Sequence, residues 1–275
     1  MYDSEPEAQL PNPKPVIARP GGKTRMLKAI LPLIRPHTCY CEPFGGGMAV
    51  LLAKEPSQLE VVNDIDRSLV AFHRNAKLHL EALQDELDLV LNAREEFEDY
   101  GAQRGLTEIQ RAARWFIRNK LSFGGMGGTF AISRTQPLGS RAQRILAIRS
   151  LSRRLDRTTI ENRSWEKVLD TYDHDETFFF MDPPYLDAGG AAYAGWSEHE
   201  LQRFCDRVKK LKGSWLMTFQ ECPQVRQLMA GYQVRSVTRA NGIGNAQGRK
   251  GRVYREVIIT SDQDEFTAAR KGKSA

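Results

Sequence analysis

Thr177-Phe178-Phe179-Phe180-Met181 is followed at once by Asp182-Pro183-Pro184-Tyr185. The first five residues are almost entirely apolar and rich in β-formers, which is typical of a central strand buried on both faces. Proline has no backbone N–H to donate to a sheet, so the strand is predicted to end at the aspartate. The tetrapeptide is either a plain turn or a ligand site, because open α/β sheets bind ligands beyond the carboxyl ends of their strands.

The tetrapeptide also has the groups needed to act on an exocyclic amino group of a nucleic-acid base. Such a nitrogen is a poor nucleophile, because its lone pair is delocalised into the ring. The Asp182 carboxylate and a proline-fixed carbonyl can accept its two N–H hydrogens and favour a pyramidal nitrogen. Tyr185 can stack on the base and hold it in line. These residues are therefore the candidate catalytic group.

The sequence before this strand predicts a nucleotide-binding βαβ unit with a parallel sheet. A strand, a glycine turn, a helix, a second strand and a terminal acid follow one another, after an opening loop and helix. In chain order these segments are Pro20–Lys23 (loop), Thr24–Ile34 (helix), Thr38–Cys41 (strand), Phe44–Gly47 (glycine turn), Met48–Lys54 (helix), Leu59–Val62 (strand) and Asn63-Asp64.

The sequence after Tyr185 continues the α/β pattern. Ser197-Glu198-His199-Glu200 matches a capping box for a helix that Gly213 would stop. Strands are expected over Trp215–Phe219, Tyr232–Val237 and Val253–Thr260. The fold class is therefore α/β, with a basic module inserted between its two halves.

Positive charge is concentrated in two segments. Residues 101–160 carry twelve Lys/Arg against two acids, and residues 231–255 carry six against none, although the whole chain has a net charge of only +6. Each phosphate that a cation neutralises releases counterions, so two basic segments on an acidic body favour nucleic-acid binding. A solvated basic face with no polyanionic partner is the alternative.

Size and composition indicate a packed protein. The chain has 275 residues, 41 % of them hydrophobic and 27 % charged, which is ordinary globular usage. No apolar stretch reaches the roughly 18 residues of a membrane span, and the acidic, proline-rich start is unlike a signal peptide, so a cytoplasmic location is expected. Four scattered cysteines predict reduced thiols. His37, Cys39 and Cys41 lack a second ligand pair, so no metal is expected.

Four motifs in order resemble the Dam-like (D12 class, α-group) DNA adenine-N6 methyltransferases over roughly residues 16–260. They are Pro20-Gly21-Gly22-Lys23, Glu42-Pro43-Phe44-Gly45-Gly46-Gly47, Asn63-Asp64-Ile65-Asp66 and Asp182-Pro183-Pro184-Tyr185. The resemblance implies a Rossmann-like S-adenosylmethionine-dependent methyltransferase with a mixed sheet and an inserted, mainly helical, basic target-recognition domain. It implies a catalytic domain over 16–95 and 158–262, a recognition insert over 96–157, and tails at 1–15 and 263–275.

The implied activity is methyl transfer from S-adenosylmethionine to adenine N6 in double-stranded DNA, with base flipping. The catalytic residues would be Asp182, Pro183, Pro184 and Tyr185. The cofactor-binding residues would be Arg19, Gly22, Lys23, Phe44, Gly45, Gly47, Asp64, Ile65 and Asp182. Those contacting DNA would be Arg118, Lys120, Ser122, Phe123, Arg134, Arg141, Arg249, Lys250 and Arg252. The resemblance also implies a bacterial or phage origin, and it allows a cognate restriction endonuclease; we expect a monomer.

Two departures from the family pattern keep alternatives open. Arg19 stands where the family usually has an aromatic residue, and Gly124 replaces an asparagine of the recognition insert. Phe123 beside it is expected either to insert into DNA or to pack in the core. The alternatives are a cytosine-N4 or RNA adenine methyltransferase, which shares the pocket chemistry, and a DNA-binding protein without catalytic activity.

Overall fold

The computed structural model describes residues 13–131, 140–186, 196–240 and 253–263. The chain forms two compact units. The first comprises Met1–Thr24, Gly46–Glu55 and Asp66–Ile160, and the second comprises Arg25–Gly45, Pro56–Ile65 and Glu161–Ala275.

A seven-stranded mixed sheet in the order β3-β2-β1-β4-β5-β7-β6 confirms the expected α/β class. The central strands β2, β1, β4 and β5 are parallel, β7 is antiparallel to β5, and β6 is antiparallel to β7. The strands are β1 (Cys39–Glu42), β2 (Leu59–Asn63), β3 (Thr158–Glu161), β4 (Thr177–Met181), β5 (Ser214–Gln220), β6 (Tyr232–Ala240) and β7 (Val253–Gln263).

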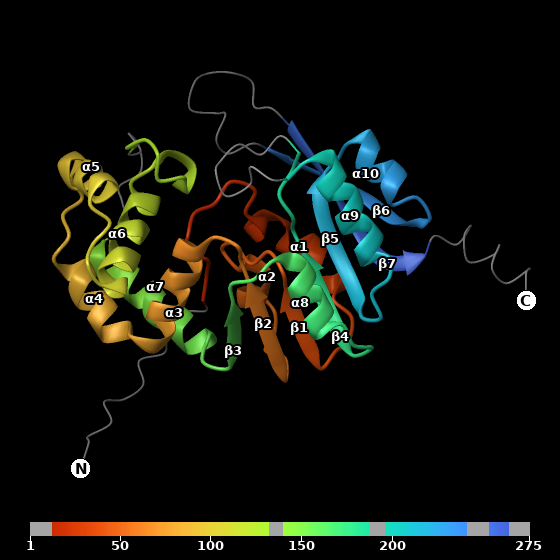
Figure 1. The fold of residues 1–275 in the computed structure, drawn as a ribbon, viewed down its shortest axis with the longest axis horizontal. Helices are drawn as coiled ribbons and strands as arrows, with labels where there is room; N and C mark the ends of the chain where they lie inside the picture. The colour runs from red at the N-terminus through yellow and green to blue at the C-terminus, as the bar shows by residue number, and fades with distance from the viewer. Residues whose placement is uncertain (1–12, 132–139, 187–195, 241–252, 264–275) are drawn as a thin grey trace, which may run out of the picture. The chain divides into compact units, whose positions relative to one another are not determined.

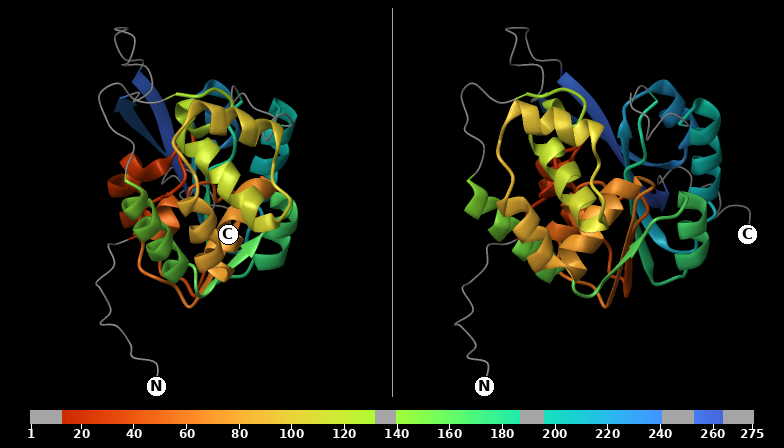
Figure 2. Two further views of the ribbon diagram at one scale, coloured as in Figure 1. Left: turned by 90° about the vertical axis from the view of Figure 1, so that its left-hand side faces the viewer. Right: turned by 60° about the vertical axis from the view of Figure 1, so that its left-hand side comes forward.

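Helices cover one face of this sheet in the second unit. The buried core on that face includes Phe179 and Met181 of β4, Met217 of β5 and Phe204 of the helix after β4. Figure 1 shows α8 and α9 in front of the sheet, and Figure 2 shows them on that same side from two further directions. The helices of this face are α8 (Trp165–Tyr172), α9 (Glu198–Val208) and α10 (Pro223–Leu228).

Helix α9 begins at the predicted N-cap and ends earlier than predicted. Only the Ser197 half of the predicted capping box forms, because the Glu200 carboxylate accepts from the Trp165 Nε1–H (2.9 Å) instead. The Ser197 side chain accepts a hydrogen bond from the Glu200 N–H (3.2 Å), as an N-cap does. The helix ends at Val208, so the prediction that Gly213 stops it is wrong. A Cβ atom at Gly213 would lie 2.6 Å from the Thr177 carbonyl oxygen. Glycine is needed there because the chain passes close to the start of β4.

The helix expected over Thr24–Ile34 is divided into three short pieces. They are η1 (Lys23–Met26), α1 (Leu27–Ile30) and η2 (Leu31–Leu33). Pro32 cannot donate the backbone hydrogen bond of an interior helical position, and it lies in the first turn of η2, where that donor is not needed.

The first unit is helical, and α6 contacts α3, α4 and α5. On its buried side Phe116 stacks on Phe72 of α3, with ring centroids 4.8 Å apart. Capping boxes at Thr107 and Ser140 open α6 and α7. The elements are α2 (Ala49–Ala53), α3 (Arg67–Leu78), α4 (Leu80–Asp88), α5 (Arg94–Ala102), α6 (Glu108–Lys120), η3 (Phe123–Gly125) and α7 (Arg141–Arg154).

All four cysteines are free thiols, as expected. Burial raises the pKa of the Cys205 thiol to about 12, which keeps it protonated and unreactive. Within the described ranges, no helix has both the length and the apolarity that a bilayer span requires.

Candidate functional site

The parallel strands bring their carboxyl ends to one edge of the sheet. Cys41 of β1 lies opposite Phe179 of β4, and Met181 of β4 lies opposite Met217 of β5, so the residues that follow these strands share that edge. We call this group the strand-end cluster. It consists of Phe44, Asn63, Asp64, Asp182, Tyr185 and Thr218, all in the second unit.

Asp182 is held by the neighbouring strand. The buried Thr218 hydroxyl of β5 donates a hydrogen bond of 2.9 Å to its Oδ1 atom. Tyr185 packs against Phe219 of the same strand, with ring centroids 5.0 Å apart. The catalytic tetrapeptide predicted from the sequence is thus anchored to β5 at its first and last residues.

Asn63 organises the turn after β1, a role that the sequence analysis did not assign. Its buried side chain donates to the carbonyl oxygens of Pro43 (2.8 Å) and Arg163 (3.1 Å), and its Oδ1 accepts from the Arg163 N–H (2.8 Å). Its own carbonyl accepts from the Gly45 N–H (2.7 Å). Its position in the motif Asn63-Asp64-Ile65-Asp66 was the only sequence signal for this residue. That motif does not reveal the distant residues, Pro43 and Arg163, to which Asn63 is bonded.

Phe44 fixes the same turn from the other side. Its ring makes edge-on contacts with Phe204 of α9 (centroids 5.5 Å apart) and with Trp196 (5.7 Å). This residue was predicted to help the backbone approach a cofactor. Its side chain packs on the helical layer, which leaves the turn's backbone as the part that can meet a ligand.

Asp64 and Ile65 follow β2 directly. The Asp64 backbone is held on both sides, because its N–H donates to the Glu161 carbonyl (3.4 Å) and its carbonyl accepts from Asn162 (2.7 Å). The Ile65 side chain is exposed. An acid and an exposed aliphatic side chain at a strand end suit a ribose and a flat heterocycle respectively.

The glycine turn continues into the first unit. Gly46 has φ +49° and Met48 has φ +56°, both in the left-handed region. A Cβ atom at Gly47 would lie 3.3 Å from the Ile17 carbonyl oxygen. The turn is therefore tightly packed and strained at Met48, since a side chain rarely adopts this conformation.

His73 of α3 contacts the glycine turn at Gly46. Its Nε2 atom lies 3.4 Å from the Gly46 carbonyl, which can only accept, so Nε2 carries the proton. Burial first, and the positive charge of Arg19 in addition, lower the pKa of His73 to about 4, although the bond to Gly46 opposes this. His73 is therefore neutral at pH 7.

This shift predicts a pH-dependent stability. The unfolded imidazole binds a proton near pH 6.5 and the folded one only near pH 4. The free energy of unfolding should therefore decrease as the pH is lowered through this window. The loss should total about 3 kcal/mol. Denaturant unfolding of His73→Gln should show a shallower decrease than wild type, whereas exposed His79→Gln should not. Equal pH dependence in all three proteins would contradict the shift.

The Pro20–Lys23 loop is a tight turn in the first unit. Gly21 has φ +82°, and the Gly22 N–H donates to the Arg19 carbonyl (3.3 Å). Lys23 is buried, and its Nζ donates to the Gly21 carbonyl (2.8 Å). The Arg19 guanidinium is paired with Asp66 and lies 5.8 Å from the Trp115 ring centroid.

The predicted DNA contacts between residues 118 and 123 lie in the last turn of α6 (Arg118 and Lys120) and in the loop that follows it (Ser122 and Phe123). Arg118 and Ser122 bind the loop itself: Arg118 donates to the Gly127 carbonyl (2.6 Å), and the buried Ser122 hydroxyl accepts from the Gly127 N–H (2.7 Å). Lys120 is half-buried 5.5 Å from the Phe116 centroid, and burial lowers its pKa.

Phe123 points outward and is 49 % exposed. Of its two expected roles, exposure favours contact with a partner over packing in the core. Met126, which the sequence analysis did not select, is 62 % exposed on the same loop. Arg134, Arg249, Lys250, Arg252 and the side chain of Arg141 lie outside the described residues.

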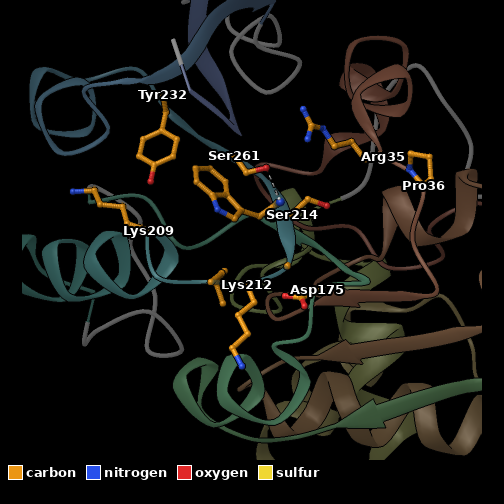
Figure 3. A pocket seen from close by; sticks show the side chains of 11 residues that line it. Arg35, Pro36, Asp175, Lys209, Lys212, Ser214, Tyr232 and Ser261 are labelled. Atoms are coloured by element: carbon orange, nitrogen blue, oxygen red, sulfur yellow. Dashed lines mark hydrogen bonds between the residues drawn. The ribbon is translucent and has the colours of Figure 1, made fainter. Parts of the chain in front are cut away.

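A cavity of about 530 Å³ lies elsewhere, at the amino end of β5 (Figure 3). Ser214, Trp215, Tyr232, Lys209 and Lys212 are among its lining residues. Ligands of α/β sheets bind at the carboxyl ends of strands, so we do not assign the reaction to this cavity. Among the described residues, no group of three or more His, Cys, Asp or Glu side chains could hold a metal ion.

Comparison with known proteins gives consistent matches. The model of the family "D12 class N6 adenine-specific DNA methyltransferase" matches residues 20–243. The type II methyltransferase M.CviBI of Paramecium bursaria Chlorella virus NC1A is 26 % identical over 232 residues, which are 80 % of this chain and 87 % of that protein. The type II methyltransferase M.MjaIII of Methanocaldococcus jannaschii is 26 % identical over 200 residues, 62 % and 69 % of the two chains.

Among solved structures, protein LPL1258 of Legionella pneumophila is 13 % identical, with 90 % of this chain and 85 % of that one aligned and a TM-score of 0.31. The sequence matches, rather than this structural one, carry the comparison.

Proposed function

We propose that the strand-end cluster is the site at which this chain methylates DNA, because the chain belongs to the family of D12 class N6 adenine-specific DNA methyltransferases. The resemblance carried by the four motifs is confirmed, and the chain is a site-specific DNA adenine methyltransferase. The observation that carries the assignment of the site is the Asp182 carboxylate at the end of the central strand β4, held by Thr218.

S-adenosylmethionine, the methyl donor that we propose, supplies a methyl group on a sulfonium centre. Asp182 and the Pro183 carbonyl would accept the two N–H hydrogens of adenine N6, so that its lone pair faces the methyl group. Tyr185 would stack on the base and hold it in line. The N6 atom would gain the methyl group and release one proton to solvent, and the C–S electron pair would stay on sulfur. No covalent enzyme intermediate is needed.

Several residues suit this methyl donor. In the second unit, Asp64 would accept the ribose hydroxyls, Ile65 would cover the adenine, and the backbone at Phe44 and Gly45 would approach the cofactor. In the first unit, Gly22, Lys23 and Gly47 would contribute, with Lys23 near the methionine carboxylate. The left-handed Gly46, where a Cβ atom would meet no described atom within 4 Å, supports a close approach of backbone to ligand.

Arg19, which stands where the family usually has an aromatic residue, also has a side chain that can stack on the cofactor. Asp66 and the Trp115 ring fix its guanidinium. A planar guanidinium stacks on aromatic faces. We propose that Arg19 takes the place of the aromatic residue usual in the family.

Double-stranded DNA is the proposed substrate, with adenine flipped out of the helix at a cost of about a few kcal/mol. We propose residues 96–157 as the target-recognition insert. Within it, Arg118 and Ser122 would shape the loop and Phe123 and Met126 would contact the bases. Lys120, Arg134, Arg141, Arg249, Lys250 and Arg252 would neutralise phosphates. Two relatives are named type II methyltransferases, and we propose that this chain likewise has a cognate restriction endonuclease. We also propose that it acts as a monomer.

The contact of the recognition loop with DNA can be tested with Phe123→Ala. Removing a stacked or inserted aromatic ring should weaken duplex binding about tenfold. Leu106→Ala is the control, because Leu106 is also apolar and 91 % exposed in the first unit but lies outside the loop. Fluorescence anisotropy of a labelled duplex measures both, and equal affinities of the two variants would exclude the contact.

The reaction is tested by nucleoside mass spectrometry of unmethylated plasmid DNA after incubation with the protein and S-adenosylmethionine. New N6-methyladenine is expected. Single-molecule sequencing of the treated plasmid, which detects the methylated base directly, would then locate its sequence context. Formation of N4-methylcytosine instead would mean that the same mechanism acts on cytosine rather than on adenine. Methylation of RNA alone would reject duplex DNA as substrate. Absence of cofactor binding would favour a DNA-binding protein without catalytic activity.

A further inference from the structure

Asn119, near the end of α6, joins two segments that the proposed function gives to different ligands. It is 3 % exposed. One segment is Ala18–Lys23, which contains the proposed cofactor residues Arg19, Gly22 and Lys23. The other is Ser122–Gly127, the recognition loop that carries Phe123 and Met126. Both belong to the first unit.

The side chain of Asn119 binds both segments at once. Its Oδ1 accepts from the Ala18 N–H (3.0 Å), and its Nδ2 donates to the Ala18 carbonyl (2.8 Å). The same Nδ2 donates to the Gly125 carbonyl (2.5 Å). Both N–H hydrogens are therefore used, one toward each segment, and only a carboxamide offers this combination of one acceptor and two donors.

The two segments are also in direct contact. A Cβ atom at Gly125 would lie 2.1 Å from the Ala18 carbonyl oxygen, and Gly125 has φ +73°. Only glycine fits there, both for space and for conformation. The backbone of the recognition loop thus packs on the backbone of residue 18, with Asn119 bridging the pair.

Each segment has one further anchor. On the cofactor side, Arg19 is paired with Asp66, and Asp66 caps α3 by accepting from the Ser68 N–H (3.0 Å). On the DNA side, the Ser122 hydroxyl donates to the carbonyl of Asn119 itself (3.2 Å) and accepts from the Gly127 N–H (2.7 Å). A displacement of either segment must therefore move or break the bonds of Asn119.

We propose that Asn119 is a positioning residue that couples cofactor binding to DNA binding. The proposal rests on the proposed function, because it takes Ala18–Lys23 as cofactor contacts and Ser122–Gly127 as DNA contacts. A ligand that orders one segment also orders the other through Asn119, so the second ligand loses less conformational freedom when it binds. Linkage requires the effect to be reciprocal.

The coupling is measured with S-adenosylhomocysteine, which lacks the methyl group and so does not react. Its dissociation constant is determined by calorimetry with and without a short duplex taken from plasmid DNA around a site that the wild-type protein methylates. The wild-type protein should bind it about tenfold more tightly with the duplex, within the usual range of coupling between sites. Asn119→Asp should reduce this ratio to about one.

Asn119→Asp keeps the oxygen that faces the Ala18 N–H and replaces both donors with a second oxygen, which faces two carbonyls. Asn75→Asp is the matched control. Asn75 is equally buried in α3, and its Nδ2 donates to the Ala71 carbonyl of its own helix (2.8 Å). It should keep the wild-type ratio. Gly125→Ala removes the same junction by steric clash and should lose the coupling as Asn119→Asp does.

Hydrogen exchange on the wild-type protein tests the coupling without any variant. Saturating S-adenosylhomocysteine should slow exchange of the Ser122–Gly127 amides. If the compound binds and these amides are unaffected, or if Asn119→Asp keeps the tenfold ratio, the coupling is refuted and the proposed function stands. If the compound does not bind the wild-type protein at all, the proposed function itself fails.

Discussion

Replacing Asp182 with alanine should lower the rate of methyl transfer at saturating substrates by about a thousandfold, or roughly 4 kcal/mol in activation free energy. The variant removes the acceptor that orients adenine N6 and localises its lone pair. Duplex affinity should change little, because the proposed phosphate contacts lie elsewhere. Single-turnover methylation with labelled cofactor, together with anisotropy of a labelled duplex, measures the two quantities.

Two further variants make this result specific. Thr218→Val keeps the carboxylate and removes the hydroxyl that donates to it (2.9 Å), so the rate should fall only about tenfold, the worth of one hydrogen bond. Asp206→Ala removes an aspartate from the exposed side of α9 and should have no effect. If Asp182→Ala retained more than a tenth of the wild-type rate, the tetrapeptide would not be the catalytic group.

Asn63→Ala should both destabilise the protein and weaken cofactor binding. Three backbone groups, the carbonyls of Pro43 and Arg163 and the Arg163 N–H, lose their buried partner. Each unsatisfied group costs about 1–3 kcal/mol, and partial relaxation leaves a total of about 3 kcal/mol. The turn after β1 then loses its anchor, so S-adenosylmethionine affinity should fall about thirtyfold, or roughly 2 kcal/mol.

The control for this variant is the neighbouring Asn162→Ala. Asn162 is exposed and makes one hydrogen bond to the Asp64 carbonyl (2.7 Å), so the free energy of unfolding should fall by less than about 1 kcal/mol. Denaturant unfolding and calorimetric titration measure stability and affinity in both variants. Wild-type affinity in Asn63→Ala would mean that the turn does not depend on its bond to β2.

The sequence predicted the central elements well where the signal is local. The expected and observed bounds of β4 are the same, Thr177–Met181, and β2 differs by one residue. An apolar run followed by proline has few alternative structures, so local sequence suffices. The N-cap at Ser197 was predicted for the same reason, because its partner is three residues away.

Other elements were missed or misplaced because their cause lies far away in the chain. The short strand β3, Thr-Thr-Ile-Glu, has no apolar run, and its partners in the sheet are about 100 residues earlier. Gly213 was expected to stop a helix, but it is required by the approach of the chain to Thr177. Such contacts leave no periodic pattern in the sequence.

The sequence by itself determined the α/β class, the family and the residue types of the catalytic motif, because these depend on short patterns and their order along the chain. Only the tertiary structure decided that Asn63 and Asn119 organise the turns around them, and that Arg118 and Ser122 bind their own loop. Ala18 and Asn119 are 101 residues apart. The hydrogen bonds of a buried carboxamide depend on which backbone groups the fold brings to it, and no local pattern specifies them.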